Sequence, residues 1–266
     1  MKTKHTYTHT HSLSLALLGA LLFGFAHAGT LIYVAGSNKE FGTFDLQTRV
    51  YSQITSTTQT LTALAAYNGQ LYATDFSDPS ILYTVSDTGT LSPVGNTGTN
   101  ITGLAFNASG ILYANTGDEL GTLIPSTGAY TNIGFTGFPS SNIFGTLAFS
   151  NGVLYDAIED GGEGLLASLN LTTGAATQID SHPFYSGMAL FAAQNALYGI
   201  RGISLFSINT TSAALTDLGD ITGSNRPSLF LAAVAAPTTS DVPEPATLGL
   251  FAIGGLALRL RGKRSR

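Results

Sequence analysis

The chain has 266 residues, enough for one large all-β domain or for two smaller domains. Only 10% of its residues are charged and 44% are hydrophobic, which excludes an intrinsically disordered chain. There is no cysteine, so disulfides and thiolate metal sites are excluded, and the formal charge of −5 is unevenly distributed.

The first 28 residues are predicted to be a signal peptide for export. Lys2 and Lys4 precede the apolar run LSLALLGALLFGFA, and Ala26 and Ala28 form the A-x-A pattern that a signal peptidase cleaves. Cleavage after Ala28 leaves Gly29 as the first residue. The alternative is an uncleaved anchor helix, although the apolar run is short for a membrane span.

A repeat of about forty residues fills the part of the chain that follows. Its marker is an aliphatic residue followed by tyrosine, and the tyrosines are spaced by 39, 41, 42 and 43 residues: Tyr33, Tyr72, Tyr113, Tyr155 and Tyr198. From Tyr72 onward, an apolar run and a turn such as Asn68-Gly69 precede each marker. A third run, a turn such as Thr88-Gly89 and a fourth short run follow it. Four antiparallel strands in about forty residues are the unit of a β-propeller blade.

The two ends of the repeat region complement each other. Residues 31–55 supply only three strands of a blade, and the run SLFLAAV near residue 231 is a first strand without partners. Pairing them would complete a fifth blade and leave no open sheet edge. The sequence therefore predicts an all-β, five-bladed β-propeller over residues 29–236, closed by its N- and C-terminal strands and flanked by an N-terminal signal helix and a C-terminal apolar helix. A β-sandwich or β-solenoid with coincidental spacing is the alternative.

The first strand of each blade is expected to line a narrow central channel and to carry small residues where the strands converge. The pairs Leu64-Ala65, Leu104-Ala105 and Leu147-Ala148 agree with this expectation, whereas Leu190-Phe191 fits less well.

Acidic residues gather in the loops that follow the marker tyrosines. Between residues 31 and 235 there are fourteen acidic and four basic side chains, a formal charge of −10, so no nucleic-acid partner is expected. The loops between second and third strands share one face of a propeller. The candidate ligand face consists of Glu40, Asp75, Asp78, Asp118, Glu119, Glu159, Asp160, Glu163 and Arg201.

This candidate ligand face has two interpretations. Carboxylates can bind a sugar or a divalent cation, and calcium is the metal that best suits oxygen ligands. Alternatively, the loops simply hold the charges that a soluble protein needs, since no loop matches the D-x-[DN]-x-[DN]-G calcium pattern. No other cofactor is expected.

Few residues suit catalysis. After signal cleavage the chain retains one histidine, His182. The stretch Asp87-Thr88-Gly89 matches an aspartic-protease motif, but the repeat replaces its aspartate with Ser126 and Thr172, which indicates a hairpin turn. We expect no enzymatic activity; the alternative is a carbohydrate-active enzyme, a glycoside hydrolase or lyase, that uses carboxylates of the candidate ligand face.

The C-terminal end has three parts after a polar linker at residues 237–241. Val242, Pro243, Glu244 and Pro245 come first, and an apolar run beginning at Ala246 follows. The basic end consists of Arg259, Arg261, Lys263, Arg264 and Arg266. The apolar run measures roughly 22 Å as a helix, shorter than the hydrocarbon core of a bilayer, and its basic end is expected to stay cytoplasmic.

Residues 242–266 resemble the PEP-CTERM sorting signal of Gram-negative bacteria, although Leu260, Gly262 and Ser265 interrupt the basic cluster. An ordinary membrane anchor is the alternative. The resemblance implies cleavage near Pro243-Glu244-Pro245 by an exosortase, in organisms that produce exopolysaccharide. It implies a route of export and names no activity.

Together these observations predict an exported protein of the cell surface or extracellular matrix, with a non-catalytic body that binds polysaccharide, a cation or a protein. The expected partners are signal peptidase, the exosortase, the inner membrane transiently, and exopolysaccharide.

Overall fold

The computed structural model describes residues 30–138, 147–160, 163–179 and 188–236, which form twenty β-strands. The predicted signal peptide, the linker, the C-terminal sorting signal and His182 lie outside the described residues. Within the described ranges there is no helix with the length and hydropathy of a membrane span.

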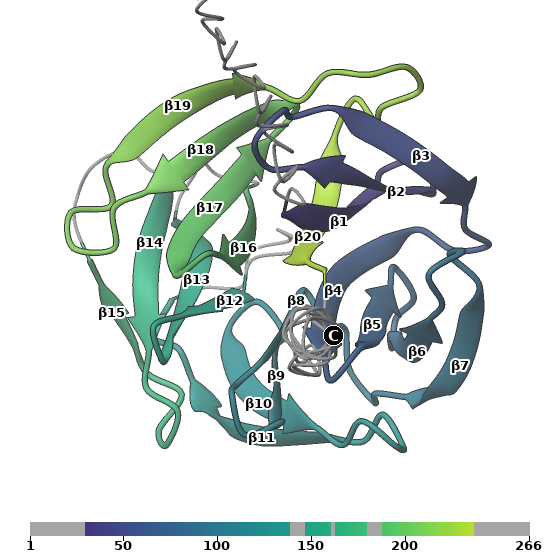
Figure 1. The fold of residues 1–266 in the computed structure, drawn as a ribbon. Helices are drawn as coiled ribbons and strands as arrows, with labels where there is room; N and C mark the ends of the chain where they lie inside the picture. Colours follow the sequence, from purple (N-terminus) through teal and green to yellow (C-terminus); the bar gives the residue numbers. More distant parts are fainter. Residues whose placement is uncertain (1–29, 139–146, 161–162, 180–187, 237–266) are drawn as a thin grey trace, which may run out of the picture.

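The strands form five four-stranded antiparallel sheets arranged around a central axis, as Figure 1 shows. The sheets are blades of a five-bladed β-propeller, which confirms the predicted fold. Blade 1 contains β20 (Phe230–Ala235), β1 (Leu31–Gly36), β2 (Glu40–Asp45) and β3 (Tyr51–Ser56). Blade 2 contains β4 (Leu61–Tyr67), β5 (Gln70–Asp75), β6 (Ile81–Val85) and β7 (Leu91–Asn96).

The other three blades follow in chain order. Blade 3 contains β8 (Gly103–Phe106), β9 (Leu112–Asn115), β10 (Glu119–Leu123) and β11 (Tyr130–Phe135). Blade 4 contains β12 (Leu147–Ser150), β13 (Val153–Asp160), β14 (Glu163–Leu169) and β15 (Ala176–Gln178). Blade 5 contains β16 (Ala189–Ala193), β17 (Ala196–Arg201), β18 (Ser204–Ile208) and β19 (Leu215–Asp220).

Blade 1 is assembled from both ends of the repeat region, as predicted. The C-terminal strand β20 pairs antiparallel with β1, and Ile32 lies opposite Ala235. No other blade needs a distant strand, because each is built from four consecutive strands. The pairing of β20 with β1 therefore closes the ring.

The marker tyrosines occupy one register in all five blades. Each lies directly opposite a residue of its blade's innermost strand, and the pairs are Tyr72 with Ala65, Tyr113 with Ala105, Tyr155 with Ala148, Tyr198 with Phe191, and Tyr33 with Val234. Three of the five partners are alanine, which leaves room for the tyrosine ring beside the inner strand. The spacing of about forty residues thus arises because the same cross-strand contact recurs in every blade.

Alternate residues of each inner strand enter different hydrophobic cores. Leu64 packs in the core between blades 1 and 2, whereas Ala65 packs in the core between blades 2 and 3. At the position equivalent to Ala65, Phe191 is only 2% exposed, and its ring meets Phe44 edge-on and stacks on Tyr198. The larger residue fits because it fills the core between blades 5 and 1.

The turns between third and fourth strands lock neighbouring blades together. Gly174 in blade 4 has a φ of +79°, and a Cβ atom there would collide with the carbonyl oxygen of Gly134 in blade 3. Gly128 approaches Gly95 in the same way, one blade earlier. The predicted hairpin at residues 87–89 is confirmed.

This contact gives a first prediction. Gly174→Ala should destabilise the protein clearly more than Gly152→Ala, because both glycines have a φ near +80° but no atom lies within 4 Å of a Cβ at Gly152. The conformational cost of the Gly152 change is about 1 to 2 kcal/mol. Urea unfolding of both variants measures the difference, and equal midpoints would contradict the contact between blades.

Candidate functional site

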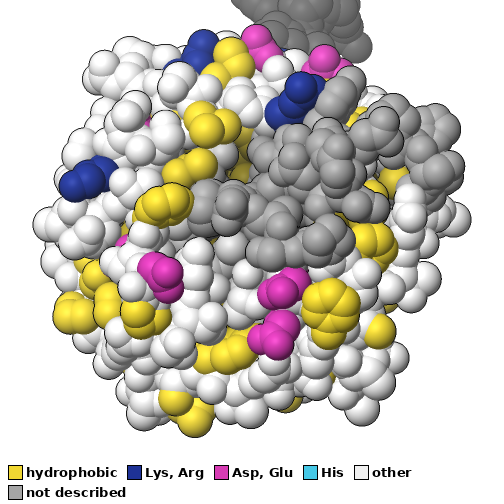
Figure 2. Space-filling model, turned by 180° about the vertical axis from the view of Figure 1, so that it is seen from behind, with side chains coloured by type: hydrophobic (Ala, Val, Ile, Leu, Met, Phe, Trp, Pro, Cys, Tyr) yellow, Lys and Arg dark blue, Asp and Glu magenta, His cyan; other side chains and the backbone are white. Residues whose placement is uncertain are grey.

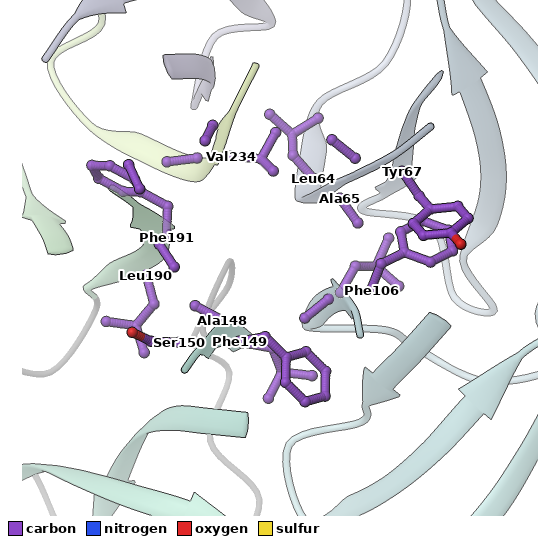
Figure 3. Close-up of a pocket in the computed structure, with 18 of the residues that line it drawn as sticks. Leu64, Ala65, Tyr67, Phe106, Ala148, Phe149, Ser150, Leu190, Phe191 and Val234 are labelled. Atoms are coloured by element: carbon purple, nitrogen blue, oxygen red, sulfur yellow. The ribbon is translucent and has the colours of Figure 1, made fainter. Parts of the chain in front are cut away.

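The inner strands enclose a central cavity of about 980 Å³. It is lined by β4, β8, β12, β16 and β20 and by the hairpins that follow β4, β12 and β16. The small residues expected at the inner strands, Ala65, Ala105 and Ala148, are among those that line it. Figure 3 looks into the cavity and shows side chains from all five blades around it.

The cavity has an apolar wall that contains aromatic rings, including that of Phe191 across the cavity from Tyr67 and Phe106. Tyr67, Phe106 and Phe149 come from three consecutive inner strands, as Figure 3 shows. The rings of Tyr67 and Phe106 stack with centroids 5.1 Å apart. Leucine and alanine side chains complete the wall.

Amide side chains stand at the mouth of the cavity, in the hairpins between first and second strands: Asn68, Asn151, Gln194 and Asn195. Each amide group can donate and accept hydrogen bonds. Asn151 Nδ2 donates to the carbonyl oxygen of Asn195 at 3.1 Å, which joins the hairpins of blades 4 and 5. Among the described residues, none that lines the cavity carries a charge.

This combination of groups selects for a neutral ligand. A charged ligand would lose hydration inside the cavity without gaining an opposite charge. Aromatic rings offer apolar contact area, while a few amides at the mouth can fix orientation, which is the usual composition of small-molecule sites. The sequence predicts that the inner strands line a central channel but assigns no ligand to it, although Phe106 and Phe149 follow the same Leu-Ala pair.

The candidate ligand face lies at the opposite ends of the inner strands. The loops that carry Glu40, Asp78 and Arg201 leave the second strands at the end away from the cavity mouth. Figure 2, which shows the molecule from behind, displays acidic side chains in ones and twos rather than in one patch. No group of three metal-binding side chains occurs in the part of the chain that the structure describes.

Asp75 holds its own loop in place. Its Oδ1 accepts a hydrogen bond from the backbone N of Ile81 at 2.9 Å, and its Oδ2 accepts from Ser77 Oγ at 2.9 Å and from Tyr83 Oη at 3.0 Å. The residue is 2% exposed. This carboxylate is therefore engaged within blade 2.

The other residues of the face vary in their surroundings. Asp78 and Arg201 are exposed, whereas Glu40, Asp118 and Glu119 are half-buried. Glu40 accepts a hydrogen bond from the backbone N of Asn38 at 2.8 Å. The remaining members are Glu159 and Asp160 at the end of β13 and Glu163 at the start of β14, and their side chains lie outside the described residues.

One acidic residue outside this face, Asp156, joins two blades. It is 1% exposed on β13, and its Oδ2 accepts a hydrogen bond from Asn115 Nδ2 of blade 3 at 2.9 Å. Asn115 Oδ1 in turn accepts from Thr102 Oγ1 at 2.7 Å. No pattern in the sequence indicates this role for Asp156.

Alkaline pH should destabilise the protein through buried tyrosines. Burial, with a hydrogen bond to Asp75 and the charge of Asp75, raises the pKa of Tyr83 to about 12, and burial with the charge of Glu40 does the same for Tyr51. In the unfolded chain these groups ionise near pH 10, so the folded state binds more protons between about pH 10 and 12. The free energy of unfolding should therefore fall as pH rises through that range. Tyr83→Phe should reduce the slope in urea titrations, and an unchanged slope would contradict the prediction.

The comparisons with known proteins concern the C-terminal tail and the propeller body separately. Residues 241–264 match the PEP-CTERM protein-sorting motif, which confirms the resemblance at the C-terminus. The motif implies processing by an exosortase and an exported, cell-surface protein. No curated protein matches the chain.

Several solved structures align with this chain at low sequence identity. A chain of a nidogen/laminin complex aligns with a TM-score of 0.53 and 11% identity, over 73% of this chain and 80% of that one. A Bacteroides caccae protein of unknown function aligns with a TM-score of 0.48 and 12% identity, over 79% and 99%. The extracellular domain of a putative hybrid two-component system from B. thetaiotaomicron aligns with 0.41 and 17%, over 73% and 28%. At these identities the likeness concerns the fold alone.

Proposed function

We propose that this chain, which ends in a PEP-CTERM sorting motif, is a non-catalytic binding protein of the cell surface or extracellular matrix of a Gram-negative bacterium. Its signal peptide directs export, the inner membrane holds it transiently, and an exosortase then removes its tail. Its ligand is a neutral saccharide segment of an exopolysaccharide, bound in the central cavity. The proposal includes no cofactor.

The observation that supports the ligand is the cavity wall. Its aromatic and aliphatic side chains offer apolar area to the C–H groups of a sugar, and the amides at the mouth can pair with hydroxyl groups. The cavity volume lies at the upper end of the range for small-molecule sites, which suits a short stretch of saccharide.

The same lining favours binding over hydrolysis. Glycosidases of the usual kind place two carboxyl groups about 5 to 9.5 Å apart on either side of the scissile bond. None of the described residues that line the cavity is acidic. An enzyme would have to use the loops of the opposite face.

Isothermal titration calorimetry of the processed protein tests the ligand and its place. Linear neutral glucose oligomers should bind more tightly than oligomers of uronic acids. Ala192→Phe, which adds a ring to the cavity wall on β16, should weaken binding at least about tenfold by occupying ligand space.

Asp78→Asn is the matched control, since Asp78 is exposed on the opposite face. It should leave the affinity for neutral oligomers unchanged. Binding that survives Ala192→Phe and is lost with Asp78→Asn would refute the cavity as the site and place the ligand on the acidic loops.

A further inference from the structure

Both ends of the propeller body leave it beside the cavity mouth. Thr30 Oγ1 accepts a hydrogen bond at 2.7 Å from Gln194 Nε2, which stands at the mouth. At the other end, the backbone N of Ala236 donates to the carbonyl oxygen of Leu31 at 2.8 Å, and Ala236 itself lines the cavity. The sorting tail is therefore attached close to the propeller axis, at the face on which the cavity opens.

This cavity face differs in charge from the opposite face. In blades 2 to 5, the hairpins between first and second strands contain no charged residue. At the opposite face, each blade has a charged residue in the loop between its second and third strands or at a strand end beside that loop.

The cavity face also carries exposed aliphatic side chains. Leu31, Ile111 and Val153, each directly before the aliphatic-Tyr pair of its blade, are 46%, 45% and 38% exposed. These positions follow the hairpin tips or, for Leu31, begin the first strand of the chain. The central part of this face can approach a lipid surface without burying charge, because the charged residues Arg49 and Asp87 lie in the outer turns between third and fourth strands.

The connection between Ala236 and the membrane segment is short. Nine residues, 237–245, separate Ala236 from the apolar run that begins at Ala246. A nine-residue random coil has a root-mean-square span of roughly 16 Å, and nine fully extended residues reach at most roughly 30 Å. The radius of gyration of the body is about 17 Å, so a tether at the axis leaves little freedom to turn the opposite face toward the bilayer.

We infer that the membrane-held precursor presents its cavity face to the lipid headgroups, so that the bilayer covers the cavity mouth until the exosortase cuts the tail. Cleavage then frees this face, while the charged loops face outward throughout. The inference goes beyond the proposed ligand and does not require it.

The absence of cysteine from the chain allows a direct test. Ser109→Cys places a thiol at the hairpin tip of blade 3 on the cavity face, and Ser77→Cys places one in a loop of the opposite face. Both serines are exposed, so the two substitutions are matched in size and accessibility. The probe is a bulky polyethylene-glycol maleimide added to spheroplasts of cells that lack the exosortase.

The precursor with Ser77→Cys should be labelled, whereas the precursor with Ser109→Cys should lose most of its labelling. After detergent solubilisation, or in the processed protein, both thiols should react alike. Equal labelling of the two precursors in the membrane would overturn the inference. Protection of Ser109→Cys that persists in detergent would also overturn it, because the bilayer would then not be the cover.

Discussion

Phe230→Ala is expected to destabilise the protein by about 3 to 5 kcal/mol, the usual cost of removing a buried phenylalanine ring. Phe230 is 1% exposed at the start of β20, and its ring meets Tyr51 edge-on with centroids 5.9 Å apart. It belongs to the core between blades 5 and 1. The substitution therefore weakens the closure of the ring as well as one core, and chemical denaturation of the processed protein measures the loss.

The neighbouring residue provides the control. Leu229 is 39% exposed and precedes β20, so Leu229→Ala should change the free energy of unfolding by much less. Similar destabilisation by the two variants would show that β20 is not held by the burial of Phe230.

Glu244→Ala is expected to abolish processing and leave the precursor in the inner membrane. Glu244 is the single charged residue of the segment Val242–Pro245, which lies within the matched sorting motif and near which the resemblance implies cleavage by the exosortase. The apolar run and the basic end remain intact in this variant, so insertion should be normal. Cell fractionation with mass determination of the product distinguishes precursor from processed protein.

Ser240→Ala lies in the linker before this segment and should be processed normally. Release of the Glu244→Ala protein with the mass of the normal product would refute recognition through the glutamate. Retention of both variants would point to a general defect in export.

The repeat in the sequence determines most of the architecture. The five regularly spaced aliphatic-Tyr pairs predict five blades. In the structure, the tyrosine of each pair lies opposite the equivalent position of its own blade's inner strand. The pairing of β20 with β1 was predictable because three strands at the N-terminal end of the repeat region and one strand at its C-terminal end complete a single sheet.

The candidate site was harder to predict because sequence does not give the direction of a side chain. Asp75 and Asp78 occupy the same loop, yet Asp75 accepts hydrogen bonds inside it and Asp78 is exposed. The cavity depends on how far five inner strands stay apart, which is a property of the closed ring. A local pattern such as Leu104-Ala105-Phe106 does not specify the distance between the inner strands.

The pairing of β20 with β1 also determines how the propeller body would respond to a mechanical load. Drag on a body that is held through the chain beyond Ala236 pulls β20 along its own length, because the tether leaves from the end of that strand. The hydrogen bonds to β1 run across the strands, so this load shears them together instead of opening them one at a time. The strand that closes the ring is thus loaded in shear for as long as the chain beyond Ala236 holds the body.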